Sequence, residues 1–219
     1  MSMINQHLKR GIGLPASIVI CALAFSITPA HAAFVSYSFT GMTDAQDPAD
    51  SLPVLGSFQL NKATDGNGGV YNGAVTNFRI TIGGYTSVFA PGINGVTLSQ
   101  GTALGGGPSG DRWALVSAAT GPMLNGTVPY SFDLHLDRAG GGLFTSTALQ
   151  DPPSFGKLTQ ARWRLFFEDA QGTPFASIGS IASLTAVPLP PAVLLFGAGL
   201  VALVGLGVGG LRNLRDSQK

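Results

Sequence analysis

Apolar residues recur at every second position over much of residues 34–187, and this period constrains the fold of the 219-residue chain more than any other feature. Successive side chains of a β-strand point to opposite faces, so alternation predicts half-buried antiparallel strands. The clearest segments are 34–40, 56–60, 78–82, 85–90, 112–116, 128–136, 161–168 and 178–187. No helical period of convincing length interrupts them, and the fold class we predict is therefore all-β.

Turn residues separate these segments at short intervals. Asp65-Gly66-Asn67-Gly68, Gly83-Gly84 and Asp151-Pro152-Pro153 are typical of tight turns, and Gly101–Gly110 predicts a longer loop. Roughly ten short strands with such spacing are typical of a single antiparallel β-sandwich of the jelly-roll kind. We place this domain at residues 33–186.

The charge and cysteine content of residues 33–186 exclude several classes of function. Seven basic and ten acidic side chains give a formal charge of −3, so no basic surface for nucleic acid is expected. The chain's one cysteine, Cys21, lies in an apolar run outside this domain. The domain therefore has no disulfide, no cysteine-based zinc site and no thiol nucleophile.

The N-terminus has the pattern of a secretory signal peptide. Lys9 and Arg10 precede an apolar run over 12–27, and Ala30-His31-Ala32 places small residues where signal peptidase reads the chain. We predict residues 1–32 as the signal peptide, cleaved between Ala32 and Ala33. An uncleaved membrane anchor is the alternative.

The C-terminus carries a second apolar segment. Residues 192–211 contain no charged or strongly polar side chain, and as a helix they span about 30 Å, the thickness of a bilayer's hydrocarbon core. Arg212 and Arg215 predict a cytoplasmic basic flank over 212–215, before a tail over 216–219. A helix buried in a soluble core is the alternative to a transmembrane helix.

A proline motif directly precedes that segment: Val187, Pro188, Leu189 and Pro190, followed by Pro191 and Ala192. Motif, apolar helix and basic flank together resemble the PEP-CTERM sorting signal, in the variant whose motif reads Val-Pro-Leu-Pro-Ala. Pro191 stands where that variant has alanine. The resemblance covers residues 187–215, with the motif at 187–192.

The resemblance implies that the chain is a substrate of an exosortase, a membrane cysteine peptidase of exopolysaccharide-producing Gram-negative bacteria. The helix would anchor the chain transiently in the inner membrane with its ectodomain in the periplasm, before delivery to the cell surface or extracellular matrix. The prolines hold the backbone extended, which suits recognition by a protease. A permanent single-pass anchor with a proline-rich linker is the alternative.

Few residues of the domain predict chemistry. Asp133, His135 and Asp137 share one face of a strand and lie close enough to hold a metal or tune a proton, although an ordinary solvated face explains them as well. The loops with Asp44, Asp47 and Asp50, and with Asp65 and Asn67, offer oxygen ligands for calcium but match no known loop spacing. We assign no metal site and no cofactor.

No catalytic motif is present, since neither a G-x-S-x-G elbow nor a paired-carboxylate pattern occurs. We therefore expect a non-enzymatic, exported surface or matrix protein with no catalytic residues. Its expected partners are signal peptidase, the exosortase, the membrane and exopolysaccharide. The alternatives are a carbohydrate-binding or calcium-dependent adhesive module exported by the same route and, third, a hydrolase.

Overall fold

The structure, a computed structural model, describes residues 34–187 except 46–49 and 106, and this part of the chain is all-β, as predicted. Its strands and one 3₁₀ turn are β1 (Phe34–Thr43), β2 (Pro53–Asn61), β3 (Val70–Asn72), β4 (Val75–Ile82), β5 (Tyr85–Ala103), β6 (Ser109–Thr120), β7 (Val128–Ala139), η2 (Phe155–Lys157), β8 (Gln160–Glu168) and β9 (Pro174–Val187).

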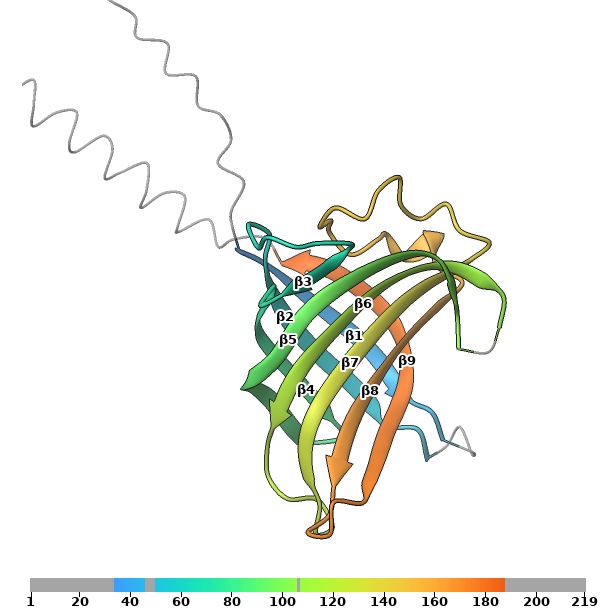
Figure 1. The fold of residues 1–219 in the computed structure, drawn as a ribbon. Helices are drawn as coiled ribbons and strands as arrows, with labels where there is room; N and C mark the ends of the chain where they lie inside the picture. The colour runs from blue at the N-terminus through green and yellow to red at the C-terminus, as the bar shows by residue number, and fades with distance from the viewer. Residues whose placement is uncertain (1–33, 46–49, 106, 188–219) are drawn as a thin grey trace, which may run out of the picture. The chain divides into compact units, whose positions relative to one another are not determined.

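The strands form one closed antiparallel sheet (Figure 1). The order β5-β4-β2-β1-β9-β8-β7-β6 returns to β5 through the β5–β6 pairing, and β3 pairs only with β5. Apart from β3, which the sheet order skips, each strand pairs with the next along the chain, and β1 pairs with β9 to join the ends. Eight strands therefore make an up-and-down barrel. The two separate sheets of the expected sandwich are not formed, because closure leaves no break in hydrogen bonding between two sheets.

Strand β5 explains how a sheet with sandwich-like patterning closes. Its first half pairs with β4 and its second half stays with β6, with a register shift between Phe89 and Asn94. Pro91, which has no N–H to donate, lies in this irregular stretch. Such irregularities bend a strand. The chain therefore continues as one strand where the sequence predicts a strand end at Ala90.

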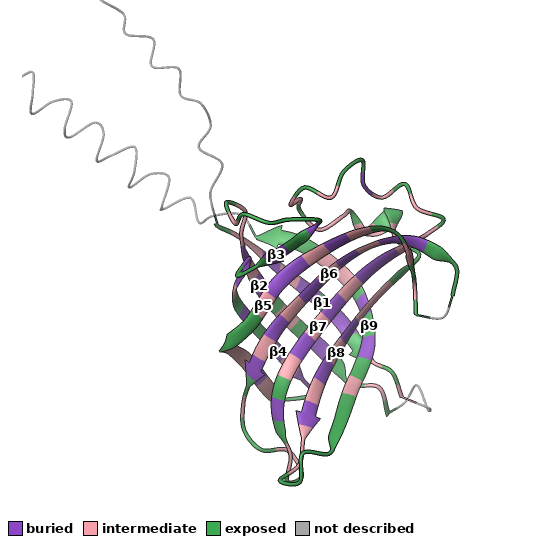
Figure 2. Ribbon diagram, in the orientation of Figure 1, coloured by how far each residue is buried: buried purple, intermediate pink, exposed green. Residues whose placement is uncertain are grey.

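Large aromatic side chains fill the barrel. The alternating burial along each strand is visible in Figure 2, and the inward rings include Phe39, Phe78, Phe132, Trp113 and Trp163, each at most 1% exposed. Phe132 of β7 stacks on Phe78 of β4 with ring centroids 4.2 Å apart and on Phe39 of β1 at 6.2 Å. These contacts join opposite walls, as expected for an eight-stranded barrel whose interior is just wide enough for its side chains.

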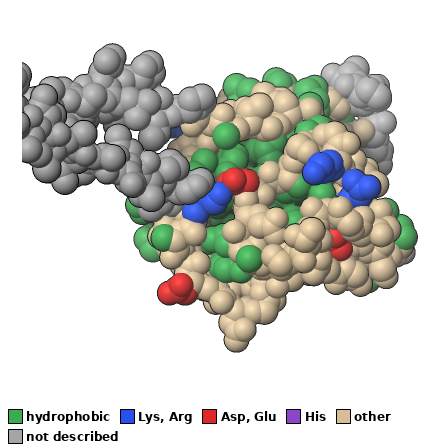
Figure 3. All heavy atoms as spheres, turned by 90° about the horizontal axis from the view of Figure 1, so that it is seen from above, with side chains coloured by type: hydrophobic (Ala, Val, Ile, Leu, Met, Phe, Trp, Pro, Cys, Tyr) green, Lys and Arg blue, Asp and Glu red, His purple; other side chains and the backbone are tan. Residues whose placement is uncertain are grey.

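The segment 140–159 between β7 and β8 crosses one end of the barrel (Figure 1), and we call it the lid. Gly140, Gly141 and Gly142 begin it with φ of 79°, 77° and 78°, a left-handed run that residues with a Cβ rarely adopt. Phe144 is buried, and Leu143 and Leu149 pack on the barrel core. Figure 3 looks onto this end, where hydrophobic side chains gather in the middle and charged ones are sparse.

The lid is also hydrogen-bonded to the barrel. The Oδ2 atom of the buried Asp111 accepts hydrogen bonds from the backbone N–H groups of Leu143 (2.8 Å) and Phe144 (3.4 Å), and Oδ1 accepts one from Gly101 (3.2 Å). The Tyr71 hydroxyl donates to the carbonyl of Thr147 at 2.8 Å. The lid is thus a fixed part of the fold.

The predicted signal peptide, the apolar segment 192–211 and its basic flank lie outside the described residues. Within residues 34–187 as described, no helix is long and apolar enough to cross a membrane.

Candidate functional site

The predicted row of Asp133, His135 and Asp137 lies on the outer face of β7, as its alternation implies. The cross-strand partners decide its chemistry. On β8 they are Arg164 opposite Asp133 and Arg162 opposite His135, and on β6 Arg112 lies opposite Asp137. The row is therefore the centre of a six-residue charged cluster across β6, β7 and β8.

Two of the three arginines hold the two aspartates. Arg112 donates from Nε and Nη2 to the two carboxylate oxygens of Asp137 at 2.8 and 2.9 Å, and Asp137 is only 1% exposed. Arg164 forms the same two-pronged contact with Asp133, with Nε to Oδ1 at 2.9 Å. These hydrogen bonds raise the pKa of both guanidinium groups. Paired charges of this geometry satisfy a partly buried carboxylate.

Because both aspartates are paired with arginines, His135 has no free carboxylate beside it with which to bind a metal. Its Nε2 lies 3.8 Å from Oδ2 of Asp133, and its Nδ1 is buried without a hydrogen-bond partner among the described residues. Both aspartates already direct their oxygens at guanidinium groups. No group of three or more potential metal ligands occurs in the part of the chain that the structure describes.

We expect His135 to make stability depend on pH. Burial lowers the pKa of His135 below its usual 6.5, and this outweighs the opposing effect of Asp133 and Asp137, while Arg112 and Arg164 act in the same direction as burial. The unfolded chain then binds the proton first, so the free energy of unfolding is largest above pH 6.5 and falls as the pH drops below it, by at most about 1.4 kcal/mol per pH unit.

Urea unfolding of the purified chain at pH 7.5, 6.5 and 5.5 measures this effect. His135 is the one histidine of residues 33–219, so no other histidine contributes in a chain lacking the signal peptide. A His135→Gln variant should lose most of the slope between pH 7 and 5.5. An unchanged slope in the variant would refute the assignment.

Arg162 is the cluster's unpaired cation. Its cross-strand neighbour is His135 instead of a carboxylate, no ion pair or hydrogen bond of its side chain is found among the described residues, and its Nε is buried without a partner. The guanidinium lies against the loop between β5 and β6, since a Cβ on Gly105 would come within 3.1 Å of its Nη2. Three arginines against two aspartates leave one positive charge uncompensated.

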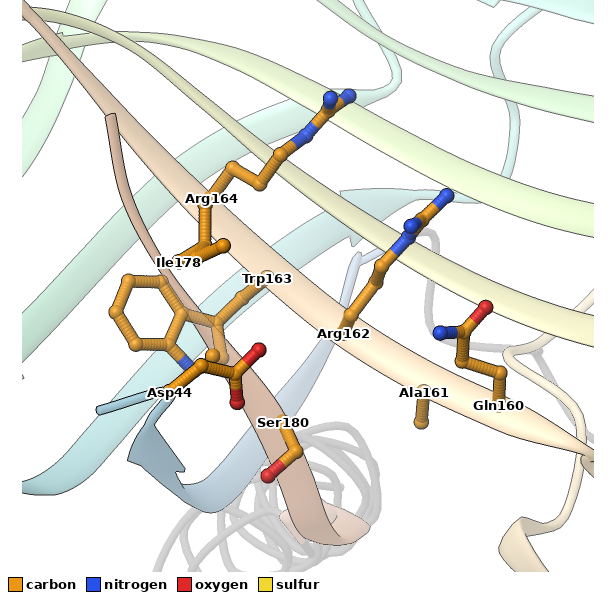
Figure 4. Close-up of a pocket in the computed structure, with 9 residues that line it drawn as sticks. Asp44, Gln160, Ala161, Arg162, Trp163, Arg164, Ile178 and Ser180 are labelled. Atoms are coloured by element: carbon orange, nitrogen blue, oxygen red, sulfur yellow. The ribbon is translucent and has the colours of Figure 1, made fainter. Parts of the chain in front are cut away.

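A pocket lies beside Arg162 on β8 and β9, and the Arg162 and Arg164 side chains extend from it away from Asp44 and Ser180 (Figure 4). It is lined by the residue that follows β1 and by residues of β8 and β9: Asp44, Gln160, Ala161, Arg162, Trp163, Arg164, Ile178, Gly179 and Ser180. In Figure 4, Gln160, Arg162 and Arg164 extend to the same side of β8. The pocket thus combines cations with amide, hydroxyl and carboxylate groups.

An aromatic pair lies further along the same face. The rings of Tyr130 on β7 and Phe166 on β8 have centroids 6.1 Å apart, and the Arg164 guanidinium lies 5.1 Å from the Phe166 ring. Alternation predicts an inward Tyr130, and this prediction is wrong. A register shift between Pro129 and Ser131 turns Tyr130 outward, where it is 39% exposed.

The remaining predicted site residues are not assembled into a site. Asp65 and Asn67 line a separate surface depression with Asn72, Asp44 lies in the pocket of Figure 4, and Asp47 is outside the described residues. Both tryptophans are fully buried, so neither offers a face to a ligand. Of the sorting motif, Val187 is the last residue of β9. Pro188, Leu189 and Pro190 lie outside the described part, as do Ala32, Ala33, Arg212 and Arg215.

The arginines on the strands flanking β7 are the residues that the sequence did not single out. Arg162 and Arg164 are two positions apart, as are Asp133, His135 and Asp137, so in an antiparallel pair the two rows can face each other. That spacing is a usable signal once β7 and β8 are known to be adjacent. No family model, curated protein or solved structure matches the chain.

Proposed function

We propose that the chain is an exported, non-enzymatic protein of the cell surface or extracellular matrix, delivered through its C-terminal signal by an exosortase. One observation supports this most. The first and last strands pair with each other, with Ser36 opposite Val187, so the barrel closes between the predicted signal-peptidase site and the proline motif. Every strand that closes the barrel lies in residues 34–187. Cleavage outside these limits would release a domain with its sheet complete.

The position of Val187 fits the same proposal. It is the last residue of β9 and 45% exposed, so the motif begins where the sheet ends. A peptidase acting beyond Val187 would not need to unpair β9. Absence of catalysis is supported by the cluster's geometry, because both carboxylates beside His135 are held by arginines.

Replacement of Pro188 and Pro190 by alanine tests the sorting signal. The double variant keeps the apolar segment and its basic flank, so it should still insert in the membrane. We expect it to accumulate at full length, while the parent chain is shortened by about the mass of the C-terminal helix and tail. Immunoblots of membrane and medium fractions from the native host measure the two sizes.

Two controls make the test specific. The first control is a variant with Thr185→Ala and Ala186→Ser, which alters the two strand residues before the motif and leaves the motif intact. Its processing should persist. Deletion of the exosortase should make the parent behave like the double variant. If parent and double variant have one size in a host with the exosortase, the motif is a linker of a permanent anchor.

Signal-peptide cleavage is a separate expectation. N-terminal sequencing or intact mass of the exported protein should give Ala33 as the first residue, leaving one residue before β1 begins at Phe34. A membrane-bound form that still begins at Met1 would contradict it and favour an uncleaved anchor.

A second candidate function, carbohydrate binding by the barrel, is favoured by the Tyr130–Phe166 pair, of which Tyr130 is 39% exposed, on the same outer face as the unpaired Arg162. Aromatic rings and polar side chains gathered on one outer face are common features of a sugar-binding surface. Binding of the purified protein to the host's exopolysaccharide, with and without a chelator, tests this function and its dependence on calcium.

A further inference from the structure

We infer that the outer face of β8 binds an acidic polysaccharide, in which Arg162 takes the carboxylate of a uronic acid residue and the Tyr130–Phe166 pair stacks on a neighbouring sugar ring. The inference deepens the carbohydrate-binding candidate and rests on it for the class of polymer. We call Gln160, Arg162, Arg164 and Phe166, which alternate along this face, the β8 strip.

The unpaired Arg162 side chain favours an anionic ligand. Arg112 and Arg164 each hold an aspartate in a two-pronged contact, and Arg162 between them has no such partner among the described residues. Its guanidinium presents a planar fork that matches a carboxylate. Neutral His135 opposite it adds no compensating charge. A ligand carboxylate would complete the alternation of charges across β7 and β8.

The other groups of the pocket favour a sugar acid over a simple anion. Gln160 and Ser180 offer donors and acceptors, and Asp44 accepts hydrogen bonds from hydroxyl groups while repelling a second negative charge. Ile178, 46% exposed, supplies apolar surface for the C–H face of a sugar. A carboxylate with hydroxyl groups beside it satisfies all of these.

The geometry of the strip favours a polymer. Arg162 and Phe166 are four residues apart on one strand, which separates them by about 13 Å along the face. The pocket's volume of about 170 Å³ is well below the roughly 300–1,000 Å³ of sites that enclose a whole ligand. A linear chain lying along β8 reaches both the guanidinium and the aromatic pair.

The test is binding of the full chain, purified in detergent micelles, to polygalacturonate by isothermal titration calorimetry. Arg162→Gln should weaken binding about tenfold or more, because a charge-assisted pair is lost. Tyr130→Ala should weaken it several-fold. Arg79→Gln is the matched control, since it removes an exposed arginine from the outer face of β4 and should change affinity less than about twofold.

Three further probes decide between ligand classes. Fully methyl-esterified polygalacturonate keeps the sugar chain without its charge and should bind at least about tenfold more weakly. Polyglutamate keeps the carboxylates without the sugar and should also bind weakly; binding equal to that of polygalacturonate would overturn the uronate assignment in favour of acidic peptide. Equal losses in Arg162→Gln and Arg79→Gln would reduce the effect to net charge and overturn the site.

Stability separates a binding residue from a structural one. Arg162→Gln removes a cation that has no carboxylate partner and lies near two other arginines. The melting temperature should therefore stay the same or rise. A lower melting temperature together with lost binding would make Arg162 structural. The binding assay is independent of processing, so its failure leaves the export proposal standing, and a failed processing assay leaves this site standing.

Discussion

Replacement of Phe132 by alanine should lower the free energy of unfolding of the barrel by about 3–5 kcal/mol. Phe132 is fully buried, and its ring lies 4.2 Å from that of Phe78 and 6.2 Å from that of Phe39. The three rings come from β7, β4 and β1, so they pack across the interior. Because the strands around them are fixed by a closed sheet, the walls cannot move in to fill the cavity.

Urea unfolding followed by tryptophan fluorescence measures this loss, since Trp113 and Trp163 are both buried. Phe34→Ala is the matched control. Phe34 begins β1 and is 48% exposed, so its removal should cost no more than about 0.5 kcal/mol. Similar losses in both variants would mean that the interior is not packed as described.

The strands could be predicted from the sequence because their signal is local. Apolar residues two positions apart, such as Tyr37 and Phe39 or Trp163 and Leu165, predict which face of a strand points inward, and these residues are buried. Closure depends instead on the pairing of β1 with β9, whose residues lie more than a hundred positions apart in the chain. No local pattern distinguishes a strand that closes a barrel from one that borders a sandwich.

Register shifts also limit what alternation in the sequence can predict. Alternation assumes an unbroken ladder, and a bulge reverses the face of every residue beyond it. The shift at Pro129 therefore moves Tyr130 from the predicted core to the outer face, and creates the aromatic pair with Phe166. Alternation alone therefore could not predict the aromatic pair of the candidate site, because a bulge produces it.

Only the β7 residues of the charged cluster could be predicted from the sequence. The row on β7 follows from alternation within one strand, whereas its meaning depends on which residues lie opposite. Arg112 opposite Asp137 and Arg164 opposite Asp133 turn potential metal ligands into ion pairs. The same register places Arg162 opposite a histidine instead of a carboxylate. The unpaired cation on which the proposed site depends is therefore a consequence of strand pairing.

Replacement of Asp111 by asparagine should release the lid and lower the free energy of unfolding by about 2–4 kcal/mol. Asp111 is 2% exposed, and both of its carboxylate oxygens accept backbone N–H groups, two of them from the start of the lid at Leu143 and Phe144. An asparagine of the same shape must turn its NH₂ group toward one of these donor sets. At least one of these backbone N–H groups then loses its acceptor.

The loss should be local as well as global, because Asp111 lies at the start of β6 and its partners lie at the start of the lid. Hydrogen exchange should quicken first at Leu143 and Phe144, and limited proteolysis should cut within 140–159 before it cuts the strands. Asp65→Asn is the control, since Asp65 is an exposed loop residue and should leave both measurements unchanged. If exchange rises equally throughout the barrel, Asp111 supports the whole sheet and is not a specific latch for the lid.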